Sequence, residues 1–167
     1  MSYGPRRYEP DSLVAIKQFF ADNKLKGGWM LDMGCGYGYY SHIGADFYDN
    51  IVAVDINQNS VAEAKKRLKD PRIIVELGKI ETYSTNQRFD LILCLVMCRR
   101  RHPTTRINVK TIGNMVKLLS KDGVLIIDVW NISIKNIKKA FNIQKIAPTI
   151  ELPDHIVKSQ SRLHIKR

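Results

Sequence analysis

The chain has 167 residues, with 27 lysines and arginines against 16 aspartates and glutamates, and therefore a formal net charge of +11. Its length predicts one domain with its own apolar core, and 44% hydrophobic with 26% charged residues excludes a disordered or collagen-like chain. No apolar run approaches the roughly 18 residues that span a bilayer. Three cysteines form no disulfide framework and the first ten residues contain no secretory leader, so we expect a cytoplasmic protein that does not contact a membrane.

Helix and strand patterns alternate from the N-terminus onward. Residues 11–23 have the apolar spacing of an amphipathic helix, with Asp11 as its N-cap. After Gly27-Gly28, the run 29–33 reads as a short strand that enters a glycine-rich turn, and a further helix follows that turn. Residues 51–56 are rich in β-branched side chains, as in a buried strand. The sequence Ser-Val-Ala-Glu at 60–63 is a capping-box pattern and predicts the next helix.

The second half continues the alternation. Strands are predicted at 73–77, 89–96 and 124–129, and helices between Pro103 and Gly123 and over 132–142. In the first of these helices Leu119 faces inward and Gly123 takes the position just past the end. The alternation over 162–166 predicts an antiparallel C-terminal edge strand. Together these elements predict an α/β fold: a single-domain, doubly wound, mostly parallel sheet over 1–167.

The positive charge lies at one end of the sequence. Residues 1–90 hold 12 basic and 12 acidic residues, whereas residues 91–167 hold 15 basic and 4 acidic ones. Either the second half has a solvated basic surface, or it faces an anionic ligand. Charge alone does not decide between these two readings.

The segment Leu31–Gly38, with the sequence LDMGCGYG, is the most informative part of the chain. Glycines after a strand let the backbone turn sharply and let a ligand approach it closely, and Asp55 lies 21 residues after Gly34, where a carboxylate accepts ribose hydroxyls. A dinucleotide fingerprint would require glycine where Tyr39 stands. Asp32, just before the turn, would repel a pyrophosphate. The pattern therefore favours a nucleoside with a cationic group, such as a sulfonium or an α-amino group.

With VAVDIN and FDLILCLVM following in order, the run LDMGCGYGYYS resembles the Rossmann-like (class I) S-adenosylmethionine-dependent methyltransferases, over about residues 10–130. The resemblance implies the cofactor S-adenosyl-L-methionine and three parts of one domain: an N-terminal arm and helix (1–24), a cofactor-binding half (25–90) and a basic, substrate-facing half (91–167). It implies cofactor contacts at Asp32, Met33, Gly34, Cys35, Gly36, Asp55, Ile56, Lys79, Ile80, Cys94 and Leu95. At Lys79 many members of the family carry an acid instead.

No catalytic side chain is assigned, because a sulfonium already carries an activated methyl group and methyl transfer needs mainly alignment and exclusion of water. The segment after 89–96 lacks the sub-family motifs for base N-methylation, cytosine methylation or protein-arginine methylation. It carries instead a group of arginines that suits an anionic substrate, because arginine pairs bidentately with phosphate or carboxylate. The predicted substrate-binding residues are Arg99, Arg100, Arg101 and Arg106.

These features predict methyl transfer to RNA or another polyanion, with a partner subunit as a further candidate because no inserted domain forms a lid. Two alternatives stay open: methylation of a small acidic metabolite, and a non-catalytic subunit that keeps the fold and binds the cofactor. We predict no metal site, because the spacing of Cys94, Cys98 and His102 matches no zinc motif.

Overall fold

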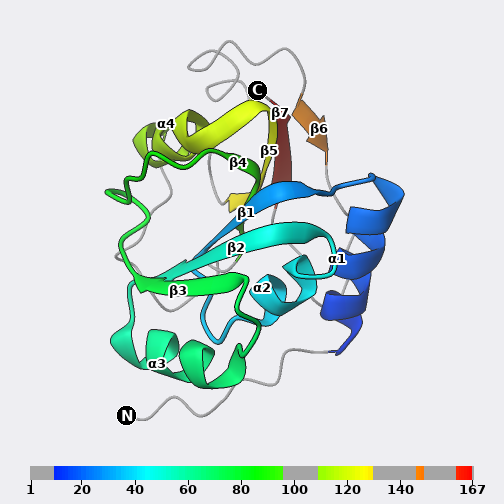
Figure 1. Cartoon of the computed structure of the whole chain (residues 1–167). Helices are drawn as coiled ribbons and strands as arrows, with labels where there is room; N and C mark the ends of the chain where they lie inside the picture. The colour runs from blue at the N-terminus through cyan, green and yellow to red at the C-terminus, as the bar shows by residue number, and fades with distance from the viewer. Residues whose placement is uncertain (1–9, 96–108, 130–145, 149–160, 167) are drawn as a thin grey trace.

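A computed structural model describes residues 10–95, 109–129, 146–148 and 161–166 of the chain. Its centre is a seven-stranded sheet in the order β3-β2-β1-β4-β5-β7-β6 (Figure 1). The strands β1 (Gly27–Met33), β2 (Tyr48–Asp55), β3 (Ile73–Leu77), β4 (Phe89–Cys94) and β5 (Leu119–Val129) all run parallel. The strand order reverses between β1 and β4, which is where open α/β sheets bind their ligands. The predicted doubly wound, mostly parallel sheet is confirmed.

The C-terminal strand lies inside the sheet and does not form its edge. β7 (Ser161–Lys166) pairs antiparallel with β5, and the short β6 (Ile146–Pro148) pairs antiparallel with β7 on its other side. The prediction of an edge strand is therefore wrong in its position. Alternation along a strand reports one buried face and does not show whether a neighbour covers the outer hydrogen-bonding groups.

Helices cover both faces of the sheet and create two apolar layers. The helices α1 (Pro10–Asp22), α2 (Tyr39–Gly44) and α3 (Gln58–Arg67) lie on one face, and α4 (Val109–Leu118) lies beside β5 on the other (Figure 1). Neighbouring residues of β1 point to opposite layers: Met30 joins the core under α1–α3, and Leu31 joins the core under α4. Burial on both faces explains why these parallel strands read as continuous apolar runs.

Several predicted boundaries are wrong. Helix α1 already includes Pro10, so Asp11 lies within the helix and is not its N-cap. Helix α3 begins at Gln58, two residues before Ser60, because the side chain of Asn57 is the N-cap and accepts hydrogen bonds from the amides of Asn59 and Ser60 at 2.9 and 3.2 Å. Helix α4 ends at Leu118, and β5 begins directly at Leu119, which pairs with Phe89. Gly123 therefore lies within a strand, five residues past the helix, and the glycine there does not mark a helix end. The helix predicted over 132–142 lies outside the described residues.

Asp90 holds together three strands at the amino end of the sheet. Its Oδ2 accepts hydrogen bonds from the amides of Gly28 and Trp29 at 2.9 and 3.0 Å, and its Oδ1 accepts one from the hydroxyl of Ser120 at 2.9 Å. A Cβ on Gly27 would lie 2.8 Å from the same carboxylate, so only glycine leaves room for it. The carboxylate on β4 thus links β1 to β5 at the end opposite the glycine-rich turn.

Candidate functional site

The glycine-rich turn follows β1 at the carboxyl end of the parallel strands. Gly34, Gly36 and Gly38 all have a positive φ, of 79, 55 and 77°, which glycine adopts without strain. The amides of Gly34 and Cys35 both donate to the carbonyl of Val54, at 2.7 and 3.0 Å. The turn is therefore fixed against the end of β2, and it follows β1, which borders the point where the strand order reverses.

Asp55 connects the turn with the two segments that follow β2 and β3. Its Oδ2 accepts a hydrogen bond from the amide of Gly36 at 2.9 Å, and its Oδ1 accepts one from the amide of Asn57 at 2.8 Å. Its carbonyl accepts one from the amide of Gly78 at 2.9 Å. Each carboxylate oxygen takes only one of these bonds, so both can still accept a hydroxyl.

Asp32 is a buried carboxylate directly before the turn. The residue is fully buried, and Ser41 of α2 donates a hydrogen bond of 2.6 Å to its Oδ2. Among the described residues, its Oδ1 has no hydrogen-bond partner. Burial raises the pKa of Asp32 to about 6, with Ser41 opposing that rise and the charge of Asp55 adding to it. The site thus holds a carboxylate that is still ionised near neutral pH and is incompletely compensated.

Cys35, within the glycine-rich turn, is not a reactive nucleophile. Cys35 is buried, and burial, followed by the charges of Asp32 and Asp55, raises the pKa of its thiol far above the usual range. Cys94, at the end of β4, is also buried and not part of a disulfide. A thiolate is the reactive form of cysteine, so Cys35 can serve the site only through its backbone and volume.

The other predicted cofactor-binding residues fall into an exposed group and a buried group. Ile56 is 57% exposed although it is apolar, and Lys79 is exposed beside the amide of Gly78 that bonds to Asp55. Met33, Ile80 and Cys94 are buried in the core under α4, and Leu95 is buried in the core on the other face. The structure therefore gathers Asp32, the turn and Asp55 at one place, whereas the contacts expected of the buried side chains stay predictions. Arg99, Arg100, Arg101 and Arg106 lie outside the described residues.

Ser41 and Asn57 are polar contacts of the site that the sequence did not reveal. Ser41 lies nine residues after Asp32, and a serine at this distance is not by itself a recognisable pattern. Asn57 follows Asp55 closely and could have been found as an alternative N-cap, because asparagine ranks with serine at that position.

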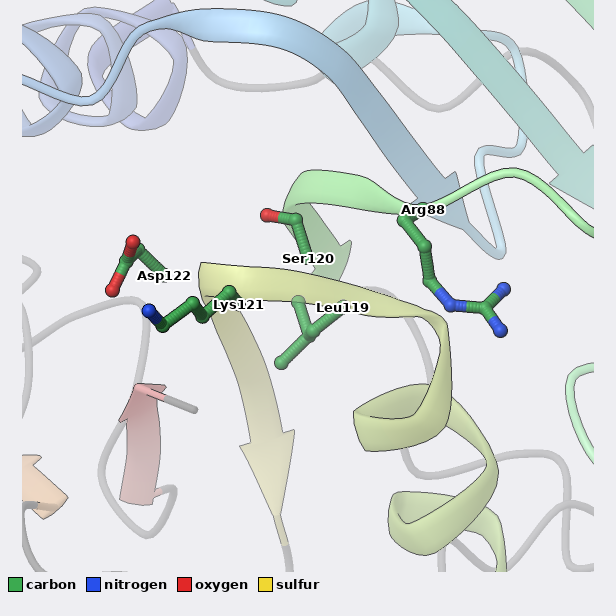
Figure 2. Close-up of a pocket in the computed structure, with 5 residues that line it drawn as sticks. All are labelled: Arg88, Leu119, Ser120, Lys121 and Asp122. Atoms are coloured by element: carbon green, nitrogen blue, oxygen red, sulfur yellow. The ribbon is translucent and has the colours of Figure 1, made fainter.

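A surface depression of about 490 Å³ lies at the opposite end of the sheet. Figure 2 shows its lining residues at the start of β5 and just before β4: Arg88, Leu119, Ser120, Lys121 and Asp122. The guanidinium of Arg88 donates to the carbonyls of Thr85, Asn86 and Gln87, at 3.4, 3.3 and 3.2 Å. This end holds the amino ends of the strands, where open α/β sheets do not place their ligands. Within the described ranges there is no group of three potential metal-binding side chains, nor a helix long and apolar enough to cross a bilayer.

Comparisons with known proteins identify the same fold and family. A family model described as a methyltransferase domain matches residues 24–165. Among curated proteins, the ubiquinone biosynthesis O-methyltransferase of Actinobacillus pleuropneumoniae serotype 7 (strain AP76) is 28% identical over 121 residues, which are 68% of this chain and 50% of that protein. The malonyl-[acyl-carrier protein] O-methyltransferase of Priestia megaterium (strain DSM 319 / IMG 1521) is 32% identical over 66 residues, 38% of this chain and 24% of that protein. The chain thus spans half or less of the length of these two relatives.

Solved structures share the architecture at low sequence identity. The N-methyltransferase NodS from Bradyrhizobium japonicum WM9, in complex with S-adenosyl-L-homocysteine, superposes with a TM-score of 0.72 at 15% identity, covering 97% of this chain and 91% of that one. Magnesium protoporphyrin IX methyltransferase from Synechocystis PCC 6803 with bound S-adenosylmethionine gives a TM-score of 0.65 at 17% identity, covering 99% and 87%. At these identities the likeness shows the fold, and the match over residues 24–165 shows the family. The chain belongs to the methyltransferase-domain family, as its resemblance to the Rossmann-like enzymes predicted.

Proposed function

We propose that the chain is an S-adenosylmethionine-dependent methyltransferase. The observation that carries this proposal is the pairing of two carboxylates, Asp32 and Asp55, around one glycine turn at the carboxyl ends of β1 and β2. The residues fit the cofactor. A buried carboxylate oxygen that has no partner within the described part of the chain suits a cationic ligand, and the carboxylate of Asp55, which has lone pairs left, suits a ribose. When bound, the cofactor supplies a methyl group activated on a sulfonium.

Each part of the turn then has a distinct task. Asp55 binds the ribose hydroxyls with the lone pairs that Gly36 and Asn57 leave free. The buried Asp32 supplies negative charge beneath the turn. The family resemblance implies that the methionine part of the cofactor lies there. The exposed side chain of Ile56 offers an apolar surface to the adenine. Without the ligand, water contacts this side chain. The chain's contribution to catalysis is alignment and exclusion of water.

Calorimetric titration with S-adenosylmethionine and with S-adenosyl-L-homocysteine tests the pocket. We expect both ligands to bind, and Asp55→Ala to weaken both. Asp122→Ala is the matched control, because Asp122 is an exposed carboxylate at the opposite end of the sheet. Failure of the wild-type protein to bind either ligand would overturn the proposal.

The acceptor that we propose is anionic, and RNA is its leading class. The support is the uneven charge: the whole excess of eleven positive charges lies in residues 91–167, which follow the cofactor-binding strands. A polymer of phosphates attracts clustered lysines and arginines through release of counterions, so that binding weakens steeply with salt. Arg99, Arg100, Arg101 and Arg106 are the residues that we propose for this contact.

A small acidic acceptor is the second candidate, because one curated relative is named for a malonyl group on a carrier protein. Incubation with methyl-labelled cofactor and fractionated cell extract distinguishes the two acceptors. Label in RNA supports the first, label in the metabolite fraction supports the second, and absence of transfer by a chain that binds the cofactor favours the non-catalytic alternative.

Charge variants test whether the arginines contact that acceptor. Replacing Arg99, Arg100 and Arg101 by alanine should remove most RNA binding and flatten its dependence on salt, with unchanged affinity for the cofactor. Replacing the exposed Lys26, Lys65 and Lys69 removes the same charge from the neutral half and should leave RNA binding near the wild-type level. Equal losses in the two triple variants would show that net charge alone is responsible.

A further inference from the structure

Ser41 is a buried hydroxyl that the expected cofactor contacts do not include. It lies in α2, is completely buried, and donates its hydrogen bond to Oδ2 of Asp32 at 2.6 Å. The short distance is typical of a hydroxyl bonded to an ionised carboxylate. The other oxygen of the same carboxylate, Oδ1, is buried and has no partner among the described residues.

The neighbouring strands offer Asp32 no substitute for this hydroxyl. In the sheet, Asp32 pairs with Ala53 of β2 and Leu93 of β4, both of which are buried and apolar. The titratable side chain whose charge acts on Asp32 is Asp55, and the thiol of the neighbouring Cys35 is protonated because burial raises its pKa. Ser41 is therefore the side-chain donor in the described structure that favours the ionised form of Asp32.

We propose that Ser41 is a positioning residue for cofactor binding: its hydroxyl holds Oδ2 of Asp32 and leaves Oδ1 to balance the positive charge of the bound cofactor. This inference rests on the proposed function, because it assigns a role within the same site. The inference predicts that Ser41 sets the pH range over which the cofactor binds, as well as the affinity at a given pH.

The expected pH dependence follows from the charge of Asp32. A cationic ligand binds the ionised carboxylate, so affinity falls as the pH drops through the pKa of the free protein, about 6. The hydrogen bond from Ser41 lowers this pKa, so removing it moves the fall in affinity to a higher pH. Each unit of such a shift weakens binding about tenfold on the acidic side.

The experiment measures the dissociation constant of S-adenosylmethionine between pH 5 and 7.5, below the range of about 7.7–8.0 in which an α-amino group titrates. For Ser41→Ala we expect the fall in affinity to begin at a higher pH than in the wild type, and Ser41→Thr, which restores the hydroxyl, should return it to the wild-type range. Ser120→Ala is the matched control, because it removes a similar bond, from Ser120 to Asp90, at the other end of the sheet. Its pH profile should coincide with that of the wild type.

Two further variants separate the possible failures. In an Asp32→Asn background, Ser41→Ala should leave the pH profile unchanged, because no carboxylate remains to be positioned. If circular dichroism shows that Ser41→Ala does not fold, Ser41→Cys fills the same space with a weaker donor and should shift the profile in the same direction. A folded Ser41→Ala or Ser41→Cys variant with the wild-type pH profile overturns the inference, whereas a wild-type protein that binds no cofactor at any pH overturns the proposed function.

Discussion

At the scale of single residues, the two acids of the site differ in how the fold compensates their charge. The carboxylate of Asp55 accepts hydrogen bonds from two backbone amides and stays partly accessible to solvent. Asp32 is fully buried and accepts a hydrogen bond from the hydroxyl of Ser41, while its Oδ1 has no partner in the ranges that the structure describes. An unsatisfied buried polar group destabilises the folded state, and such groups are concentrated where a ligand completes them. The incomplete hydrogen bonding of the Asp32 carboxylate is thus a property of the ligand-free protein.

The substitution Asp32→Asn should stabilise the ligand-free protein at pH 7–8. The pKa of Asp32 rises from 3.8 to about 6 on folding, so the folded state binds the proton more tightly and the wild type loses stability as the pH rises through this interval. The loss in the free energy of unfolding is about 3 kcal/mol, because each pKa unit corresponds to about 1.36 kcal/mol. The free energy of unfolding of Asp32→Asn should therefore exceed that of the wild type by up to this value at neutral pH, and the difference should vanish near pH 4. Urea unfolding measures it. A gain that is independent of pH would contradict the assignment.

The substitution Asp55→Ala should weaken cofactor binding at least tenfold. Hydrogen bonds to charged groups contribute about 1.5–3 kcal/mol each, and a factor of ten corresponds to 1.4 kcal/mol. The variant also removes the acceptor for the amide of Gly36, so the turn loses one of its attachments. The measurement is calorimetric titration beside Asp122→Ala, and equal affinities in these two variants would mean that the ribose lies elsewhere.

Residues of the site were predictable where their chemistry is tied to a sequence spacing. Glycines after a strand and an acid at the end of the next strand have fixed relations in the fold, so the turn and Asp55 were found, and the structure brings them into contact. The partner of Asp32 was not predictable. Whether Ser41 points toward β1 depends on how α2 packs, and a helix of six residues carries too little periodicity to show it.

At the scale of elements, the residues at the ends of each helix or strand decide how well its boundaries could be predicted. The strand 73–77 was placed correctly because turn residues enclose it on both sides. The start of β5 was missed because Leu119 continues the apolar spacing of α4 and Gly123 imitates a helix end, whereas pairing of Leu119 with Phe89 draws the chain into the sheet. Tertiary pairing, which local patterns do not contain, thus overrides them at this boundary.

The turn itself should not tolerate a side chain at Gly38. A Cβ there would overlap Cδ1 of Leu68, and the positive φ of 77° adds a cost of about 1–2 kcal/mol for any L-residue. We expect Gly38→Ala to lower the free energy of unfolding by at least that amount and to weaken cofactor binding. The matched control is Gly113→Ala within α4, which should be neutral or stabilising by up to about 1 kcal/mol. Wild-type stability of Gly38→Ala in urea unfolding would contradict this geometry.

The N-cap of α3 provides a direct test between two candidate residues. Asn57→Ala removes the acceptor of two helix amides and should destabilise the protein by about 1 kcal/mol. Ser60→Ala should change stability by no more than a few tenths of that, since Ser60 lies within the first turn. Thermal unfolding of both variants shows which residue is the N-cap. A larger loss of stability in Ser60→Ala than in Asn57→Ala would favour the capping box predicted from the sequence.

At the scale of the whole molecule, the two ends of the sheet have separate tasks. The amino ends are fixed by Asp90, which bonds to β1 and to the start of β5. The carboxyl ends carry the glycine turn, the buried carboxylate of Asp32 and the exposed Ile56. Substitutions at the first end should change stability without changing affinity, and those at the second should change both.

Removal of residues 161–167 should make the chain aggregate. β7 pairs with Val124–Val129 of β5 and is also the partner of β6, so its loss leaves an apolar edge strand unpaired. We expect the truncated chain to be insoluble, as measured by light scattering, and a synthetic peptide of residues 161–167 added during refolding to restore solubility in part. A soluble truncated monomer with wild-type thermal stability would contradict this role for β7.

The position of β7 inside the sheet also governs the order in which a newly made chain can fold. The four strands β1–β4 pair only with one another or with β5, so they can be complete before the ribosome has synthesised the segment that contains β7. The outer edge of β5 and the whole of β6 wait for the final strand to emerge. During this interval the nascent protein carries a nearly formed cofactor pocket beside an open edge, which is the stage at which a chaperone would protect it.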